Sequence, residues 1–237
     1  MIPVVLLHAF PLTHEMWRPQ IEALAGRFHV IAPDLRGFGT NPPGDGQYTL
    51  EFMVDDLLDQ LPSEPAVLCG VSMGVYIALR AAQRAPDRIR ALALADTRSE
   101  ADTNDAKLKR AAAIKTVKEQ GVAAYADGFL KSAFHNAAAA EKARPMILGN
   151  SPIGICAGLL ALASRTDTTA FLPQIKVPTL VLVGEHDALT PPSAAQSLAG
   201  KIPGAQFHTL PAAGHISNLE NPAEFNRHLL AFLERIR

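Results

Sequence analysis

Short apolar runs recur along the chain without the polar alternation that marks a half-exposed strand. Six of these runs are predicted to be strands: Val4–Leu7, His29–Ala32, Val67–Cys69, Ala91–Leu94, Thr179–Val183 and Gln206–Leu210. Continuous Val, Leu and Ile runs are typical of parallel strands that are covered on both faces. Stretches with helical spacing lie between them, at about Trp17–Leu24, Leu50–Gln60, Val75–Ala82, Pro192–Leu198 and Pro222–Ile236. This alternation predicts an α/β fold, with a mostly parallel sheet of about six strands and helices on both faces.

The stretch from residue 97 to residue 172 breaks this alternation. It contains no convincing strand, is rich in alanine and is interrupted by glycine and proline. Ser151-Pro152 is a helix-start signal, so we expect three or four short helices, the last of them capped by Ser151. A structureless loop of this length would be unusual in a compact domain. We predict a core formed by residues 1–96 and 173–237 and a helical lid formed by residues 97–172, with ordinary connecting structure as the alternative.

Length, composition and charge narrow the class of protein. The 237 residues fit one α/β domain with an insertion, and 48% hydrophobic residues can form a large core. The 22 Lys and Arg residues nearly balance the 23 Asp and Glu residues, so no basic surface for nucleic acid or membrane is expected. The apolar start, Met1–His8, is too short for a signal peptide, and Cys69 and Cys156 form no metal motif. We expect a cytoplasmic protein that binds neither nucleic acid nor a membrane; its oligomeric state stays open.

The segment Gly70-Val71-Ser72-Met73-Gly74 lies between a predicted strand and a predicted helix. In that context Gly-x-Ser-x-Gly indicates a nucleophile elbow. The two glycines remove the side chains that would collide in so sharp a turn. Ser72 is then presented at a helix N-terminus, where N–H groups and the helix dipole favour a developing anion. The alternative is a glycine-rich turn without a catalytic role.

A serine nucleophile needs a base, and the base needs an orienting acid. His215 is the predicted base, because it lies in a loop of small residues just after the last predicted strand; His186 is its best rival. Asp187 is the predicted acid. It follows the strand Thr179–Val183, and ligand chemistry gathers at the carboxyl ends of strands in open α/β sheets. Asp96 occupies the equivalent place one strand earlier and stays an alternative.

These motifs together resemble the α/β-hydrolase superfamily and, within it, the small esterase and 3-oxoadipate enol-lactonase-like group. The order Ser72, Asp187, His215 is the order of the family's catalytic triad. The resemblance implies serine hydrolysis, and it implies a sheet that lacks the family's N-terminal hairpin. The matching segments run nearly end to end: His8-Ala9-Phe10-Pro11-Leu12, Pro33-Asp34-Leu35-Arg36-Gly37-Phe38-Gly39, the elbow, the Gly184-Glu185-His186-Asp187 acid loop and Gly214-His215.

The resemblance also implies an oxyanion hole, made by the backbone N–H groups of Phe10 and Met73. Met73 directly follows the nucleophile at a predicted helix start, which is where donors are needed. Ala9 stands where the family generally has glycine, and its Cβ would restrict the loop if a positive φ were required. We expect Phe10, Leu12 and Leu189 to shape the substrate pocket. No metal or organic cofactor is implied.

These features predict a carboxylic ester hydrolase of the esterase or lactonase type. Its partner is expected to be a small-molecule ester or lactone that is cleaved through an acyl-enzyme. The same triad would also serve a carbon–carbon bond hydrolase or a perhydrolase. An alternative from another class is a ligand receptor that uses a hydrolase pocket and turns over slowly. A non-catalytic scaffold is disfavoured by the complete set of triad residues.

Overall fold

The computed structural model describes residues 1–44 and 48–237. Its centre is a six-stranded sheet in the order β2-β1-β3-β4-β5-β6, in which every neighbouring pair is parallel. The predicted parallel sheet of six strands is therefore confirmed. The central strands β1, β3 and β5 are buried at every position, which explains their unbroken apolar sequences. The strands are β1 (Pro3–Leu7), β2 (His29–Ile31), β3 (Ala66–Val71), β4 (Ile89–Ala95), β5 (Thr179–Gly184) and β6 (Gln206–Leu210).

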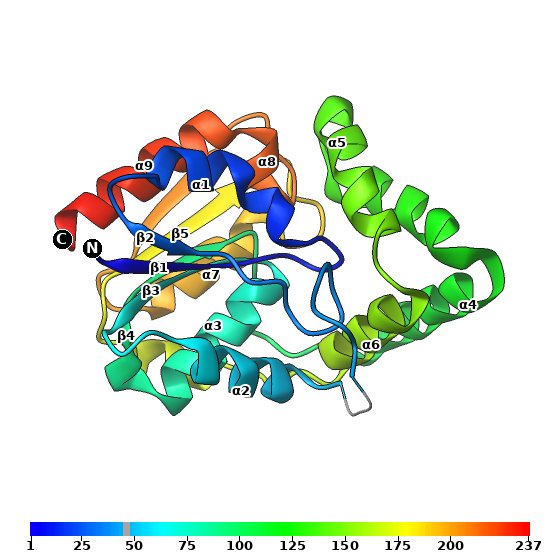
Figure 1. The fold of residues 1–237 in the computed structure, drawn as a ribbon, viewed down its shortest axis with the longest axis horizontal. Coiled ribbons are helices and arrows are strands. Elements are labelled where there is room, and N and C mark those ends of the chain that lie inside the picture. The colour runs from blue at the N-terminus through cyan, green and yellow to red at the C-terminus, as the bar shows by residue number, and fades with distance from the viewer. Residues whose placement is uncertain (45–47) are drawn as a thin grey trace.

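Helices cover both faces of the sheet (Figure 1). On one face α1 packs against α9, and on the other face α2 packs against α3. Each core helix expected from the sequence is present, with ends that differ by a few residues. The expected helices are α1 (Arg18–Leu24), α2 (Leu50–Gln60), α3 (Met73–Arg84), α7 (Pro192–Lys201) and α9 (Pro222–Arg235). The short helix α8 (Ser217–Glu220) was not expected, and 3₁₀ helices lie at His14–Trp17, Pro86–Arg88 and Thr169–Gln174.

The C-terminal helix α9 shows how local sequence and packing agree. The side chain of Asn221 accepts a hydrogen bond from the Glu224 N–H at 3.2 Å, and proline occupies the first helical position. Phe225, Leu229 and Phe232 lie on one face and are buried. Burying each of these side chains contributes roughly 1.5–3 kcal/mol, so packing rather than propensity holds the helix in place.

Between β4 and β5 the chain forms three helices, α4 (Asn104–Ala133), α5 (Ala137–Leu148) and α6 (Pro152–Ala163). Gly121, with a φ of 86°, kinks α4 into two segments, in agreement with the expected three or four helices. Ser151 caps α6 by accepting a hydrogen bond from the Gly154 N–H at 3.0 Å, as predicted. In Figure 1 these helices lie beyond the carboxyl ends of the strands. Whether they act as a separate lid stays a prediction.

Within the described residues, no single helix combines the length and the apolar composition that a membrane span needs. Only α5 and α6 taken together are long and apolar enough, and they are bent by 107° relative to each other. Packing inside the protein explains much of the apolar sequence of α6, although Ile153 and Leu160 are exposed. α6 runs along α4 and buries Ile155, Leu159 and Leu162.

The contact between α3 and β1 depends on a residue without a side chain. A Cβ added at Gly74 would overlap the backbone carbonyl of Leu7. Because both atoms belong to rigid elements, neither could move aside without shifting the helix or the strand. Gly74 therefore sets how closely the helix that begins at the elbow approaches the sheet.

We expect Gly74→Ala to lower the stability of the fold by about 1–3 kcal/mol, since the added methyl group overpacks a rigid contact. Thermal unfolding followed by circular dichroism measures the effect. Gly200→Ala, in α7, is the matched control, because a Cβ there meets no heavy atom within 4 Å. The control should keep or slightly raise the melting temperature. A Gly74→Ala variant as stable as the wild type would contradict this account of the elbow.

Candidate active site

Ser72 lies at the tight turn between β3 and α3. Its backbone has a φ of 51° and a ψ of −110°, a conformation that costs a non-glycine residue about 1–3 kcal/mol. The Ser72 N–H donates to the carbonyl of Ala95 at 3.0 Å, which ties the turn to β4. A Cβ at Gly70 would collide with the backbone of Gly74. The elbow expected from the sequence thus depends on glycine for its closest contact.

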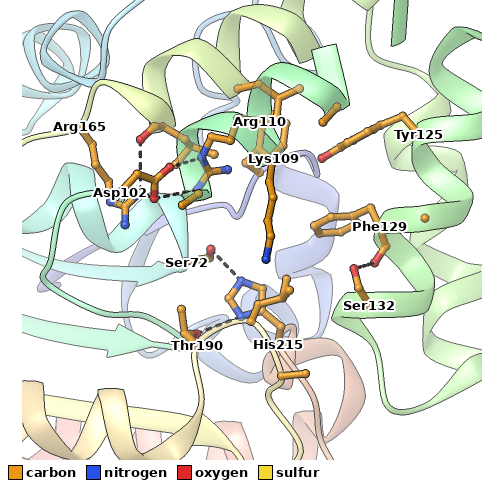
Figure 2. A pocket seen from close by; sticks show the side chains of 18 of the residues that line it. Ser72, Asp102, Lys109, Arg110, Tyr125, Phe129, Ser132, Arg165, Thr190 and His215 are labelled. Atoms are coloured by element: carbon orange, nitrogen blue, oxygen red, sulfur yellow. Dashed lines mark hydrogen bonds and ion pairs between the residues drawn. The ribbon is translucent and has the colours of Figure 1, made fainter. Parts of the chain in front are cut away.

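Ser72, His215 and Asp187 form one hydrogen-bonded chain (Figure 2). The Ser72 hydroxyl donates to Nε2 of His215 over a distance of 2.9 Å. On the other side of the ring, Nδ1 of His215 donates to Oδ2 of Asp187, also at 2.9 Å. His215 is only 4% exposed and comes from the loop after β6, while Asp187 follows β5. The structure therefore brings the three predicted side chains together at the carboxyl ends of three strands.

Thr190 completes this arrangement, and the sequence analysis missed it. Its backbone N–H donates to Oδ1 of Asp187 at 2.8 Å, and its hydroxyl donates to Oδ2 at 2.7 Å. The same hydroxyl oxygen lies 3.1 Å from Nδ1 of His215. The spacing Asp187-Ala188-Leu189-Thr190 carries a usable signal, because Asp side chains often accept from backbone N–H groups two or three residues ahead.

The charges of Asp187 and His215 stabilise each other. Burial by itself would raise the pKa of Asp187. The charge of His215 and the hydrogen bonds from Thr190 lower the pKa by more than burial raises it, so the pKa lies below its ordinary value. Burial lowers the pKa of His215, and the Asp187 carboxylate outweighs this effect, so the pKa lies above 6.5. Asp187 is therefore ionised at neutral pH and favours the protonated form of His215.

Asp96, the alternative acid, forms no hydrogen bond with the imidazole and instead accepts hydrogen bonds from two other segments of the chain. Its fully buried carboxylate accepts hydrogen bonds from the Gly184 N–H at 2.9 Å and from the Ser217 N–H and hydroxyl at 3.0 and 2.6 Å. Burial and the negative charge of Asp187 raise the pKa of Asp96 to about 7. Asp96 thus ties the segment before Asp187 to the segment after His215, whereas Asp187 contacts the imidazole itself.

His186, the rival base, lies elsewhere. Its ring stacks on His135 with 3.9 Å between ring centroids, and 44% of its side chain is exposed. His8 is buried after β1, where its Nε2 accepts the Leu35 N–H at 2.9 Å, and burial lowers its pKa to about 4. His8 is thus a neutral packing residue, and His215 is the histidine that reaches Ser72.

The backbone N–H groups of Phe10 and Met73 have no protein acceptor within residues 1–44 and 48–237. Met73 is the first residue of α3, where N–H groups lack helical partners. Ala9 does not have a positive φ, so its Cβ imposes no strain on the loop. The Ala9 N–H donates to the sulfur of Met16 at 3.2 Å. The Phe10 and Met73 amides are therefore free to bind an oxyanion, and their role stays a prediction.

A cavity of about 670 Å³ opens at Ser72 and His215, between the core and α4. Phe10 and Leu189 contribute to its wall, as expected. Leu12 is different: it is fully buried in the core and does not line the cavity, so we no longer place it in the pocket. A leucine in a loop between strand and helix can face either way, and packing under the loop decides the outcome here.

Charged side chains line the α4 side of the cavity (Figure 2). Arg110 and Arg165 both form ion pairs with Asp102, and the Arg165 guanidinium lies 4.5 Å above the ring centre of Tyr76. Lys109 extends from the same helix into the cavity. None of these residues was expected in the pocket; for Lys109 and Arg110 the reason is that the sequence of α4 does not indicate which side of the helix faces the core.

No three His, Cys, Asp or Glu residues in the described part of the chain are arranged to hold a metal ion. Cys69 is buried in β3, and burial raises the pKa of its thiol, which disfavours the reactive thiolate. Cys156 is half-buried on α6. A reaction without metal or organic cofactor stays a prediction.

Known proteins share both the sequence and the fold. A thermophilic esterase from Thermogutta terrifontis, solved with malate bound, is 38% identical, with a TM-score of 0.93 over 100% of this chain and 90% of that chain. The 3-oxoadipate enol-lactonase 2 of Acinetobacter baylyi is 30% identical over 93% of this chain and 84% of its own length. A pimeloyl-(acyl-carrier protein) methyl ester esterase of Aromatoleum aromaticum is also 30% identical, over 93% and 94%. The model of the alpha/beta hydrolase family matches residues 4–228, and this chain is therefore a hydrolase that belongs to the alpha/beta hydrolase family.

Proposed function

We propose that this hydrolase cleaves a small carboxylic ester or lactone through a covalent acyl-enzyme. The observation that carries the proposal is the chain of hydrogen bonds from Asp187 through His215 to Ser72, which opens directly into the cavity. The cavity volume of about 670 Å³ suits a small molecule. Relatives named as esterases and an enol-lactonase support an ester or lactone as the substrate.

In the first half of the reaction, the Ser72 oxygen attacks the substrate carbonyl carbon while His215 Nε2 takes the serine proton. Asp187 stabilises the imidazolium that forms. The carbonyl oxygen becomes an oxyanion, which the Phe10 and Met73 N–H groups would bind; each such donor is worth about 3 kcal/mol. The bond to the alcohol oxygen then breaks, and that oxygen takes the proton from His215.

In the second half, a water molecule attacks the acyl-enzyme and gives a proton to His215. The same two amides bind the second oxyanion. When the bond between the acyl carbon and Ser72 breaks, His215 returns the proton to the serine oxygen and the carboxylic acid leaves. In a lactone both products are one molecule, because the released hydroxyl and carboxyl groups belong to the same chain.

A panel of p-nitrophenyl esters of increasing chain length, together with simple lactones, tests the proposal by steady-state kinetics. Multiple rapid turnovers of an ester or lactone are expected. Slow single turnover would favour a ligand receptor instead. Turnover confined to carbon–carbon cleavage or peracid formation would assign the same three residues to another reaction.

Ser72→Ala should lower kcat for esters by about 10⁶-fold, because the residue carries the covalent step. The fold should remain intact, as judged by circular dichroism. In the wild type, a sulfonyl fluoride should label Ser72, and mass spectrometry of the digested protein locates the adduct. Near-normal kcat in the purified variant, or an adduct on another residue, would rule out the mechanism.

Asp187→Asn should mainly reduce catalysis, whereas Asp96→Asn should mainly reduce stability. Asp187→Asn should lower kcat by about 10⁴-fold, since an amide cannot stabilise the imidazolium and favours the wrong tautomer. Asp96→Asn should lower kcat by less than about 100-fold and should mainly lower the melting temperature, because it disturbs buried hydrogen bonds. Kinetics and thermal unfolding of both variants decide the matter. If Asp96→Asn were the less active variant, Asp96, which follows β4, would be the catalytic acid instead of Asp187.

The pH dependence of kcat/KM should follow the ionisation of His215. The base must be neutral, so activity should rise with pH through a pKa above 6.5. Because the Asp187 charge raises the pKa of His215, Asp187→Asn should shift the increase in kcat/KM to lower pH. It should also reduce the maximal kcat/KM. The measurement uses an uncharged ester over about pH 5–9. A rise at the same pH in both proteins would show that Asp187 does not control the base.

A further inference from the structure

The cavity beside the candidate triad has an excess of positive charge. Four cationic side chains and two carboxylates line it among the described residues. The cationic side chains are those of Arg98, Lys109, Arg110 and Arg165, and the carboxylates are those of Asp102 and Asp105. A cavity lined with an excess of one sign attracts ligands of the opposite charge.

Two of these cations share one carboxylate, so this cluster keeps a net positive charge. Arg110 and Arg165 both pair with the carboxylate of Asp102, whose side chain is almost completely buried. Arg165 also donates to the carbonyl of Glu100 at 2.8 Å. These residues form an ion-paired wall of the cavity, because Asp102 holds both guanidinium groups; the buried Nε of Arg165 has no hydrogen-bond partner among the described residues.

Arg98 is partly committed as well. Its guanidinium donates to the backbone carbonyl of Leu189 at 2.6 Å, at the loop between the acid and Thr190. This bond holds the loop, and no carboxylate in the described part of the chain forms an ion pair with the guanidinium. Arg98 therefore adds to the potential of the cavity while its geometry is set by the loop.

Among the described residues that line the cavity, Lys109 is a cation whose ammonium group forms no ion pair. It lies in α4, and Figure 2 shows its side chain reaching across the cavity, with the ammonium directed toward Ser72 and His215. No carboxylate of the described residues lies within 4.0 Å of it. Asp105, one helical turn earlier, is placed for an i,i+4 pair, yet the two side chains do not form one.

From this arrangement we propose that the substrate carries a carboxylate in addition to the scissile ester or lactone, and that Lys109 binds that carboxylate. The inference rests on the proposed function. The ammonium forms a charge-assisted hydrogen bond with the carboxylate and places the scissile carbonyl at Ser72. Phe10, Leu159 and Leu162 line the same cavity and cover the carbon chain between the two groups.

Two matched pairs of esters test the proposal, because the carboxylate can be on either side of the scissile bond. The acyl pair is 4-nitrophenyl hemiglutarate against 4-nitrophenyl pentanoate, which have the same number of acyl carbons. The alcohol pair is 4-acetoxybenzoate against phenyl acetate. For each pair the measured quantity is the ratio of kcat/KM for the anionic ester to kcat/KM for the neutral one.

In at least one pair, Lys109→Gln should lower this ratio by about tenfold, the loss expected for one charge-assisted hydrogen bond. Lys107→Gln is the control, since Lys107 lies on the same helix, is exposed and does not line the cavity. It removes the same charge from the protein and should leave both ratios as in the wild type. The wild-type ratio should also fall with added salt. An equal change in both variants, or no change in either pair, would overturn the proposal.

A binding measurement separates this inference from the proposed function. Calorimetry with glutarate and with its uncharged diamide needs no turnover. Glutarate should bind the wild type about tenfold more tightly than it binds Lys109→Gln, because its carboxylate pairs with the ammonium, whereas the diamide should bind both proteins equally. If no ester is hydrolysed and this difference persists, the proposed function fails and the carboxylate site stands. If esters are hydrolysed and both proteins bind glutarate equally, the carboxylate site fails alone.

Discussion

The candidate site depends on the backbone of Ser72, which is held in a left-handed conformation at the end of β3. A serine would not adopt this conformation in an isolated peptide, because its Cβ meets the following carbonyl. Here the strand before it is buried along its whole length and the helix after it packs on β1. The packing of two regular elements offsets a strain of about 1–3 kcal/mol, and the strain points the hydroxyl out of the sheet.

With Ser72 held in this way, His215 and Asp187 must be brought to it, and two buried carboxylates hold the segments that carry these side chains. Asp96 accepts donors from both loops, at Gly184 and Ser217. Glu220 accepts the Gly214 N–H at 2.9 Å, directly before the histidine. Each carboxylate gathers backbone donors that would otherwise be buried without partners. Loops that lack a strand's ladder of hydrogen bonds thus acquire fixed positions.

The sheet could be predicted from the sequence because burial on both faces leaves an unbroken apolar run at each strand. The candidate triad could be predicted because parallel strands bring their carboxyl ends to one edge, so Asp187 and His215 needed only to follow successive strands. Their hydrogen-bonded contact agrees with that prediction, while their roles in catalysis await the variants. Asp96 met the same positional criterion, and only its contacts distinguish it.

The pocket was harder to predict for a different reason. Lys109 faces the cavity because of how α4 is rotated about its axis, and α4 buries few residues, among them Val117, Ala126 and Leu130. With so weak an apolar stripe, the sequence does not indicate which side faces inward. Leu12 shows the opposite case: this apolar loop residue was expected in the pocket, but its side chain packs into the core.

The helix that carries Lys109 also contacts the base. The carbonyl of Ala133, the last residue of α4, accepts the His215 N–H at 2.7 Å. Glu220 accepts the N–H groups of His135 and Asn136 just beyond this helix, both at 2.7 Å. Displacing the C-terminal end of α4 would therefore break bonds that position the imidazole, as well as moving one wall of the cavity. The proposed proton transfer at His215 therefore depends on the segment of α4 that follows the kink at Gly121, and a substrate that displaced this segment would also displace the imidazole.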